Sequence, residues 1–154
     1  MIGRKGVLYG TTTTGGSAND GVVFELAPNG TETVLHNFTG GPTDGMQPNY
    51  GSLIRDKAGN LYGTTAGGGT HTLGGTVFKL TPDGTESLLY SFTGGSDGAS
   101  PAGGVILDST GNLYGTTFGG GSSAGYGVAY KLAPDGTETV LYSFQGGNDG
   151  QYPY

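Results

Sequence analysis

The sequence contains no cysteine, and only 12% of its 154 residues are charged. The absence of cysteine excludes a disulfide framework, a thiolate zinc site and a cysteine nucleophile. No apolar run approaches about 18 residues, so no membrane insertion is predicted. Arg4 and Lys5 are not followed by an apolar stretch, so no signal peptide is visible in this chain. Twelve acidic residues against six basic ones argue against a nucleic-acid partner.

Large aliphatic side chains are also scarce, because Leu, Ile, Val and Phe together supply 30 residues. Glycine and proline, by contrast, occupy 35 and 7 positions. Helices of ordinary length cannot carry so much glycine. The low charge and the ten tyrosines and six phenylalanines argue against a disordered chain. This composition predicts an all-β protein with many turns.

Internal repeats are the main signal in the sequence. The string Leu-Tyr-Gly-Thr-Thr begins at Leu8, Leu61 and Leu113, a spacing of 53 and then 52 residues. Each copy is followed by a Pro-Asx-Gly-Thr-Glu segment at about the same distance. Such a period indicates one supersecondary unit repeated three times. We expect a single repeat domain, 1–154, with copies at about 1–50, 51–102 and 103–154.

Each full copy is predicted to form four short antiparallel strands. In the second copy these are 51–56, 61–65, about 77–80 and 86–92, separated by turns that contain Asn, Asp and Gly. Four such strands per repeat are typical of a β-propeller blade, whereas a parallel β-helix has a shorter period and a sandwich has no repeat. The expected fold is therefore all-β and β-propeller-like, with three repeats.

The third copy shows a family resemblance most fully. Its motifs are Gly111–Thr117, Gly119-Gly120, Tyr130-Lys131-Leu132, Pro134-Asp135-Gly136, Leu141–Phe144 and Asp149-Gly150. This pattern resembles the GloVer-type tandem repeat of bacterial exported proteins, and Ile106–Tyr114 is similar to the NHL class of propeller blade. The resemblance covers nearly the whole chain. It implies a bacterial extracellular or cell-surface β-propeller and no established activity.

One carboxylate recurs in the Gly-Gly-x-Asp-Gly loops, at Asp97, at Asp149 and, with one inserted residue, at Asp44. Oxygen-rich loops of this kind can hold calcium, but a good calcium site gathers several carboxylates and each loop offers one. The preferred interpretation is an Asp-Gly turn. Apart from the calcium alternative, no cofactor or metal is predicted.

Tyrosine recurs at one position of each copy, as Tyr9, Tyr62 and Tyr114. If exposed, these three side chains would offer a platform to a glycan or peptide ligand. If buried, they would pack neighbouring blades together, which is the preferred interpretation because few other large side chains are present.

The two histidines do not form a catalytic pattern. His36 stands where the other copies have Tyr90 and Tyr142, so we expect it to replace tyrosine in an outer strand. His71 lies in a variable glycine-rich loop and is a ligand-binding candidate, but no carboxylate close in sequence pairs with it for acid–base chemistry. No catalytic residue is predicted, and the chain is not expected to be an enzyme.

Two function classes stay open. The first is a binding or interaction module whose variable loops, 13–20, 66–75 and 118–127, carry specificity. The second is a structural protein whose chains assemble into a closed ring or a fibre. An enzyme is the third and least favoured class, because no site geometry can be assembled.

The strand count predicts a partner for the chain. Propellers close with about four to eight blades, whereas this chain supplies three copies. Aligning Leu8 with Leu61 places Met1 on Ile54, so the first copy is expected to lack nearly all of its innermost strand. The open edges of the resulting eleven strands invite pairing with another chain. We expect a homo-oligomer, preferably two chains in a six-bladed ring, or the remainder of a longer chain.

Overall fold

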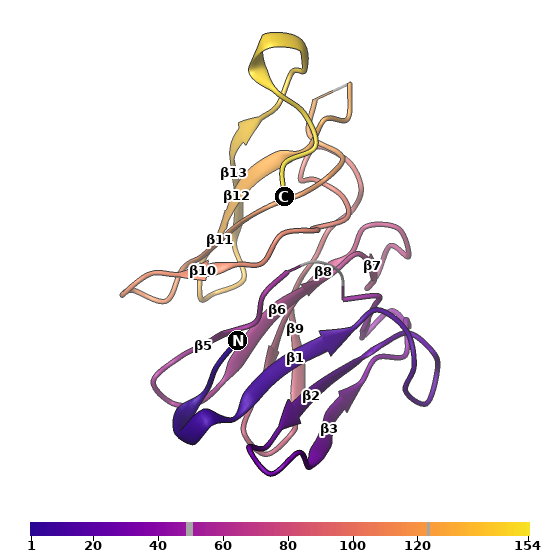
Figure 1. Ribbon diagram of the computed structural model, residues 1–154. Coiled ribbons are helices and arrows are strands. Elements are labelled where there is room, and N and C mark those ends of the chain that lie inside the picture. Colours follow the sequence, from indigo (N-terminus) through magenta and orange to yellow (C-terminus); the bar gives the residue numbers. More distant parts are fainter. Residues whose placement is uncertain (49–50, 123) are drawn as a thin grey trace.

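The computed structural model describes residues 1–48, 51–122 and 124–154, and it is built from antiparallel strands. Three sheets follow one another along the chain (Figure 1). The first sheet contains β1 (Leu8–Thr12), β2 (Val22–Leu26) and β3 (Glu32–Asn37). The second contains β5 (Ile54–Arg55), β6 (Leu61–Thr65), β8 (Thr76–Leu80) and β9 (Glu86–Ser91). The third contains β10 (Ile106–Leu107), β11 (Leu113–Thr116), β12 (Val128–Leu132) and β13 (Glu138–Ser143).

Four smaller elements complete the described fold. The short strands β4 (Gly45–Met46) and β7 (Gly67–Gly68) pair with each other, and η1 (Arg4–Gly6) and η2 (Gly147–Asp149) are single 3-10 turns. No helix in the described part of the chain has the length and apolar character needed to cross a membrane. The all-β prediction is confirmed, and the second and third copies each form a four-stranded sheet.

The three copies share the same irregularity, which shows that they are structurally equivalent. A register shift interrupts the pairing of the two outer strands after Val23, after Val77 and after Ala129. The outer hairpin of each sheet also turns in the same way. Gly84 has a φ of 85°, and the carboxylate of Asp83 accepts a hydrogen bond from the Thr85 backbone at 3.1 Å. The Asp-Gly pattern predicts this turn, since glycine tolerates a positive φ.

The inner strands are shorter than predicted. Strands were expected over 51–56 and 103–108, but only the two residues of β5 and of β10 pair. The residues before them approach one another instead, because a Cβ at Gly51 would lie 3.0 Å from the backbone of Gly104. Close backbone contact between copies therefore replaces pairing along the sheet at this point.

The first copy retains more of its inner strand than predicted. Ile2 forms a bridge with Leu8, and the Tyr9 backbone exchanges hydrogen bonds with the backbone oxygen and the terminal amine of Met1 at 2.9 and 2.7 Å. These contacts match the pairing of Ile54–Arg55 with β6. The expectation that this strand is nearly absent is corrected, because the inner strand needs only two residues.

The apolar core lies between the sheets. We call the contact of the first and second sheets the first junction, and that of the second and third sheets the second junction. At the first junction the buried rings of Phe38 and Phe78 meet edge to face, with 5.2 Å between centroids. Phe92 and Tyr130 repeat this contact at the second junction at 5.0 Å. The sheets are therefore held together by the same apolar positions at both junctions.

Backbone pairing also links consecutive copies. Gly45 and Met46 of the first copy pair with Gly68 and Gly67 of the second, and Ala99 forms the equivalent bridge with Gly119. Among the described residues no sheet closes on itself and the three sheets do not complete a ring, so the propeller prediction is not confirmed. The proposed division between the first and second copies falls at residues 49–50, outside the described residues.

Candidate functional site

Asp44 organises a polar cluster at the first junction. It is buried just before β4, and its Oδ2 accepts hydrogen bonds from the backbone and the hydroxyl of Thr39, both at 2.8 Å. Its Oδ1 accepts the Gly45 backbone N–H at 2.7 Å. Burial alone would raise the pKa of Asp44, but the hydrogen bonds from His36 and Thr39 outweigh it and hold the pKa below its ordinary value. Asp44 is therefore a carboxylate at neutral pH.

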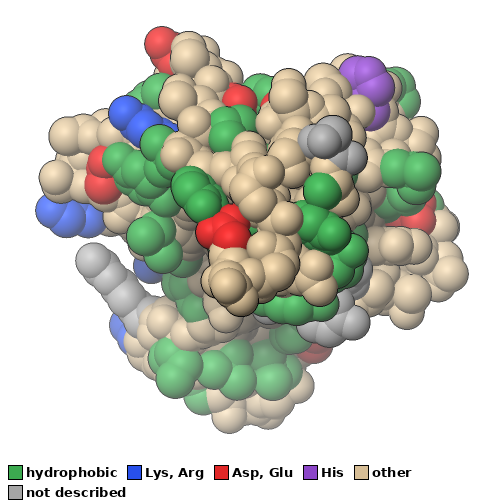
Figure 2. Space-filling model, turned by 90° about the horizontal axis from the view of Figure 1, so that it is seen from above, with side chains coloured by type: hydrophobic (Ala, Val, Ile, Leu, Met, Phe, Trp, Pro, Cys, Tyr) green, Lys and Arg blue, Asp and Glu red, His purple; other side chains and the backbone are tan. Residues whose placement is uncertain are grey.

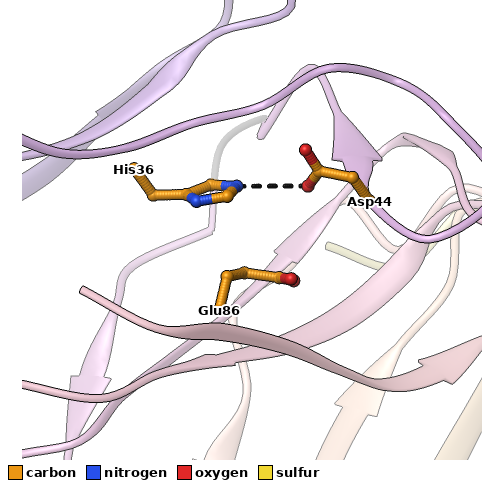
Figure 3. Close-up of side chains that lie close together, drawn as sticks. All are labelled: His36, Asp44 and Glu86. Atoms are coloured by element: carbon orange, nitrogen blue, oxygen red, sulfur yellow. Dashed lines mark hydrogen bonds and ion pairs between the residues drawn. The ribbon is translucent and has the colours of Figure 1, made fainter. Parts of the chain in front are cut away.

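His36 and Glu86 complete this cluster from two different sheets (Figure 3). His36 is on β3, and its Nε2 lies 3.2 Å from Oδ1 of Asp44. Glu86 begins β9, and its Oε1 is buried without a hydrogen-bond partner. Burial, and then the charge of Asp44, raises the pKa of Glu86 to about 7. We call His36, Asp44 and Glu86 the junction cluster.

The second junction has a related arrangement without a histidine. The hydroxyl of Tyr90 donates to Oδ2 of Asp97 at 3.2 Å, and Oε1 of Glu138 is buried without a partner. Burial, and then the charge of Asp97, raises the pKa of Glu138. The repeated carboxylate pair is thus a property of the junction, whereas the imidazole belongs to the first junction.

The third copy presents the same aspartate without a following sheet. The Tyr142 hydroxyl donates to Oδ1 of Asp149 at 2.6 Å, and the Gln145 backbone donates to Oδ2 at 2.7 Å. Tyr142 and Asp149 are exposed here, whereas the Asp44 side chain of the first copy is 11% exposed.

The three calcium candidates occupy equivalent turns. Asp44, Asp97 and Asp149 each accept a backbone N–H from five or four residues earlier, at 2.7 to 2.8 Å. This geometry agrees with the Asp-Gly turn interpretation. Calcium binding stays a prediction. Among the residues that the structure describes, only Asp44 joins a group of three metal-ligating side chains.

Two of the three recurrent tyrosines donate a hydrogen bond to an aspartate of their own copy. Tyr62 donates to Asp56 at 3.1 Å, and Tyr114 donates to Asp108 at 3.2 Å. Tyr9 lacks this aspartate, because Gly3 stands at the position of Asp56. Instead, the Arg55 guanidinium carbon lies 6.0 Å from the centre of its ring. Tyr62 and Tyr9 pack against the cores of the second and first junctions.

A cleft of about 360 Å³ opens at the second junction beside Tyr62. Its lining includes Asp56, Lys79, Leu89, Leu107 and Pro134. The equivalent space at the first junction is about 80 Å³ and is lined by Arg55, which stands where the third sheet has Leu107. The shorter leucine side chain leaves the larger cleft open.

His71 lies apart from these groups. It is exposed in the loop between β7 and β8, and its Nδ1 is 3.1 Å from the hydroxyl of Thr70. The structure gives it no carboxylate partner within the described residues. Its role as a ligand-binding residue stays a prediction.

The two end sheets expose faces whose equivalents are buried at the junctions. Leu8 is 42% exposed on the first sheet, while its equivalents Leu61 and Leu113 are each 3% exposed. On the third sheet Leu141 is 54% exposed, whereas its equivalents Leu35 and Leu89 pack against the junction cores. Apolar side chains also reach the surface in the view of Figure 2. We call the exposed surface of the first sheet around Leu8 the Leu8 face, and the exposed surface of the third sheet around Leu141 the Leu141 face.

Glu86 is the residue of the junction cluster that sequence reasoning missed. Glu32, Glu86 and Glu138 recur after the outer-hairpin turn of all three copies, which was a usable signal. His36 was noted as a replacement for tyrosine, and the structure confirms its place in the outer strand β3. Its contact with Asp44 was not predicted.

Comparison with known proteins gives one family. A family model described as the Gloeobacter/Verrucomicrobia repeat matches residues 1–154. A search of the curated proteins finds no match.

Proposed function

The chain belongs to the Gloeobacter/Verrucomicrobia repeat family over its whole length, and from this we propose that it is a non-catalytic interaction module whose repeats bind further repeats. The partner is a second copy of the chain. The observation that carries the proposal is the exposure of the Leu8 face and the Leu141 face, because each junction joins the equivalents of these two faces.

The apolar surfaces of the two faces are complementary by position. At the junctions, Leu35 or Leu89 of one sheet packs against a core that contains Leu61 or Leu113 of the next. Leu141 of one chain would contact Leu8 of a second chain in the same way. Val34, 43% exposed, extends the Leu8 face, and Tyr142, 48% exposed, extends the Leu141 face. Covering such surface is favourable in proportion to its apolar area.

The backbone supports the same contact. The Ala66 N–H donates to the Gln47 carbonyl at 3.0 Å, and the Phe118 N–H donates to the Ser100 carbonyl at 3.0 Å. Gln47 and Ser100 have φ values of 55° and 51°. Tyr152 is their equivalent and already has a φ of 55°. Tyr152 therefore shares the unusual φ of the two acceptor residues, and in the assembly its carbonyl would accept the equivalent N–H, that of Thr13, from the second chain.

The polar cluster fits the same arrangement. At the second junction Glu138 lies close enough to Tyr90 and Asp97 to interact with their charges. Asp97 raises the pKa of Glu138, and Glu138 in turn raises the pKa of Tyr90. The equivalent glutamate of the first copy, Glu32, is exposed. In the assembly it would face Tyr142 and Asp149 of the neighbouring chain.

This contact joins two different faces, so it either closes into a ring or continues as a fibre. Two copies supply six sheets, which lies within the range of about four to eight blades in known propellers. We favour the closed ring of two chains, because it leaves neither face exposed. An extracellular or cell-surface location belongs to the same proposal and is supported by the resemblance to repeats of exported proteins.

Charged substitutions on each face test the proposal. In Leu8→Glu the Leu8 face is blocked, and in Leu141→Glu the Leu141 face is blocked. Each variant alone should be a monomer, because its intact face finds no intact partner face. An equimolar mixture should form a dimer through the one remaining pair of intact faces. Size-exclusion chromatography with light scattering measures these masses.

Leu73→Glu is the matched control, because Leu73 is an exposed leucine in a loop outside both faces. It should associate as the unchanged chain does. Association of Leu8→Glu alone would contradict the proposal, since it would require contact between like faces. A mixture that stays monomeric would contradict it as well.

The cleft at the second junction favours a second candidate function, binding of a glycan or peptide. It combines Tyr62, Lys79 and Asp56 with apolar walls, as ligand sites commonly do. Leu107→Arg reproduces the residue that lines the smaller space at the first junction and should abolish binding in a nuclear magnetic resonance titration with oligosaccharides. Unchanged binding by Leu107→Arg would place the ligand elsewhere.

A further inference from the structure

We propose that the junction cluster of His36, Asp44 and Glu86 binds a first-row divalent metal ion and thereby links the first copy to the second. Zn²⁺ is the probe used to test this. Asp44 and His36 come from the first copy, and Glu86 comes from the second. A metal held by all three residues would therefore cross the first junction.

The three ligand atoms are already close. One ligand atom from each residue lies within 4.8 Å of the other two. Nε2 of His36 and Oδ1 of Asp44 are 3.2 Å apart. Tetrahedral zinc with nitrogen and oxygen ligands places neighbouring ligand atoms about 3.3 Å apart. The histidine and the aspartate therefore have the spacing of two zinc ligands, and Glu86 offers the third ligand atom within 4.8 Å of both.

The unpaired oxygen of Glu86 is an independent observation. Its Oε1 is buried and has no hydrogen-bond partner. A buried carboxylate oxygen without a partner carries a desolvation cost that a cation would offset. Oδ2 of Asp44 accepts hydrogen bonds from Thr39 and Oδ1 accepts the Gly45 backbone N–H, which together fix the carboxylate, and Oδ1 also faces His36. The cluster thus combines one oriented carboxylate with a second carboxylate whose buried Oε1 lacks a partner.

The donor set indicates the class of metal. One imidazole nitrogen and two carboxylate oxygens suit zinc and similar first-row ions, whereas calcium prefers six to eight oxygen ligands. Three protein ligands leave further coordination positions to water. The site proposed here therefore differs from the calcium prediction for Asp44, Asp97 and Asp149.

The second junction provides a control within the same chain. It repeats the aspartate and the glutamate with an unpaired Oε1 but has Tyr90 where the first junction has His36. A protonated phenol is not a metal ligand at neutral pH, and burial, together with Asp97 and Glu138, raises the pKa of Tyr90 to about 12. The histidine is therefore the residue that distinguishes the two junctions.

Isothermal titration calorimetry of the metal-free full-length chain with Zn²⁺ tests the proposal. The unchanged chain should bind one equivalent, with a rise in melting temperature that saturates at the same ratio. His36→Tyr converts the first junction to the residues of the second and should lose both effects. Glu86→Gln tests the third ligand with a side chain of the same shape. Tyr90→His should raise the stoichiometry to two.

His71→Ala is the matched control for the other histidine and should bind as the unchanged chain does. The proposal is overturned if His36→Tyr and Glu86→Gln both keep their zinc binding, or if His71→Ala loses it. It is also overturned if Ca²⁺ binds the unchanged chain and His36→Tyr equally while Zn²⁺ binds neither, because the site would then be formed by oxygen atoms alone.

Discussion

Phe92 should be one of the most sensitive positions in the chain, because it fills the second junction. Its side chain is fully buried and contacts the rings of Tyr90 and Tyr130 edge to face, with both centroid distances at 5.0 Å. Phe→Ala changes in a core cost about 3–5 kcal/mol. Aromatic pairs add about 0.5–1.5 kcal/mol each beyond burial. We expect Phe92→Ala to lower the free energy of unfolding by about 4 kcal/mol.

Urea denaturation measures this loss as a lower midpoint at an unchanged slope. Phe144 is the equivalent residue of the third copy and is half-buried on the Leu141 face. Both substitutions are best made in the Leu8→Glu background, where the chain is expected to be monomeric. Phe144→Ala should then cost much less, about 1–2 kcal/mol, because no further sheet covers it. Equal losses from the two substitutions would refute the assignment of the core to the junctions.

Two further predictions concern a turn and a titrating group. Gly84→Val should cost about 1–2 kcal/mol, because Gly84 has a φ of 85° that a β-branched residue resists, and Gly41→Val at an ordinary φ with open space is the control. Similar urea midpoints for the two variants would contradict this. Burial and then Asp97 raise the pKa of Glu138 above its ordinary value of 4.5, so the folded chain holds this proton more tightly than the unfolded chain. The stabilisation is present below about pH 4.5 and is lost as the pH rises through the folded pKa. Glu138→Gln should flatten this fall in a series of urea midpoints measured from pH 4.5 upward, and an unchanged slope would show that another group causes it.

Local features of the fold could be predicted from the sequence. The outer hairpins follow from the Asp-Gly turns, whose positive φ values the structure shows at Gly84 and Gly136. The equivalence of the copies follows from the repeat, since hydrogen-bond partners such as Tyr90 with Asp97 and Tyr142 with Asp149 recur together. The recurrence of these residues was visible in the sequence, whereas the tyrosine–aspartate hydrogen bonds themselves were not predicted.

Contacts across the junctions could not be predicted in the same way. Glu86 reaches Asp44 from a different copy, and no local pattern gives the distance between two sheets. The inner strands were overestimated for a related reason. The apolar residues Leu53 and Ile54 indicate a strand, but the approach of Gly51 to Gly104 limits pairing to two residues. Tertiary packing therefore decided both the polar cluster and the length of the strand.

The mass of the unchanged chain in solution tests the central claim most directly. Sedimentation equilibrium over a wide range of concentrations should show a species of twice the 15.4 kDa chain mass, which dissociates on dilution. This result is expected because the Leu8 face of each chain covers the Leu141 face of the other. A folded species of 15.4 kDa at every concentration would contradict the account, since both apolar faces would then stay exposed to water.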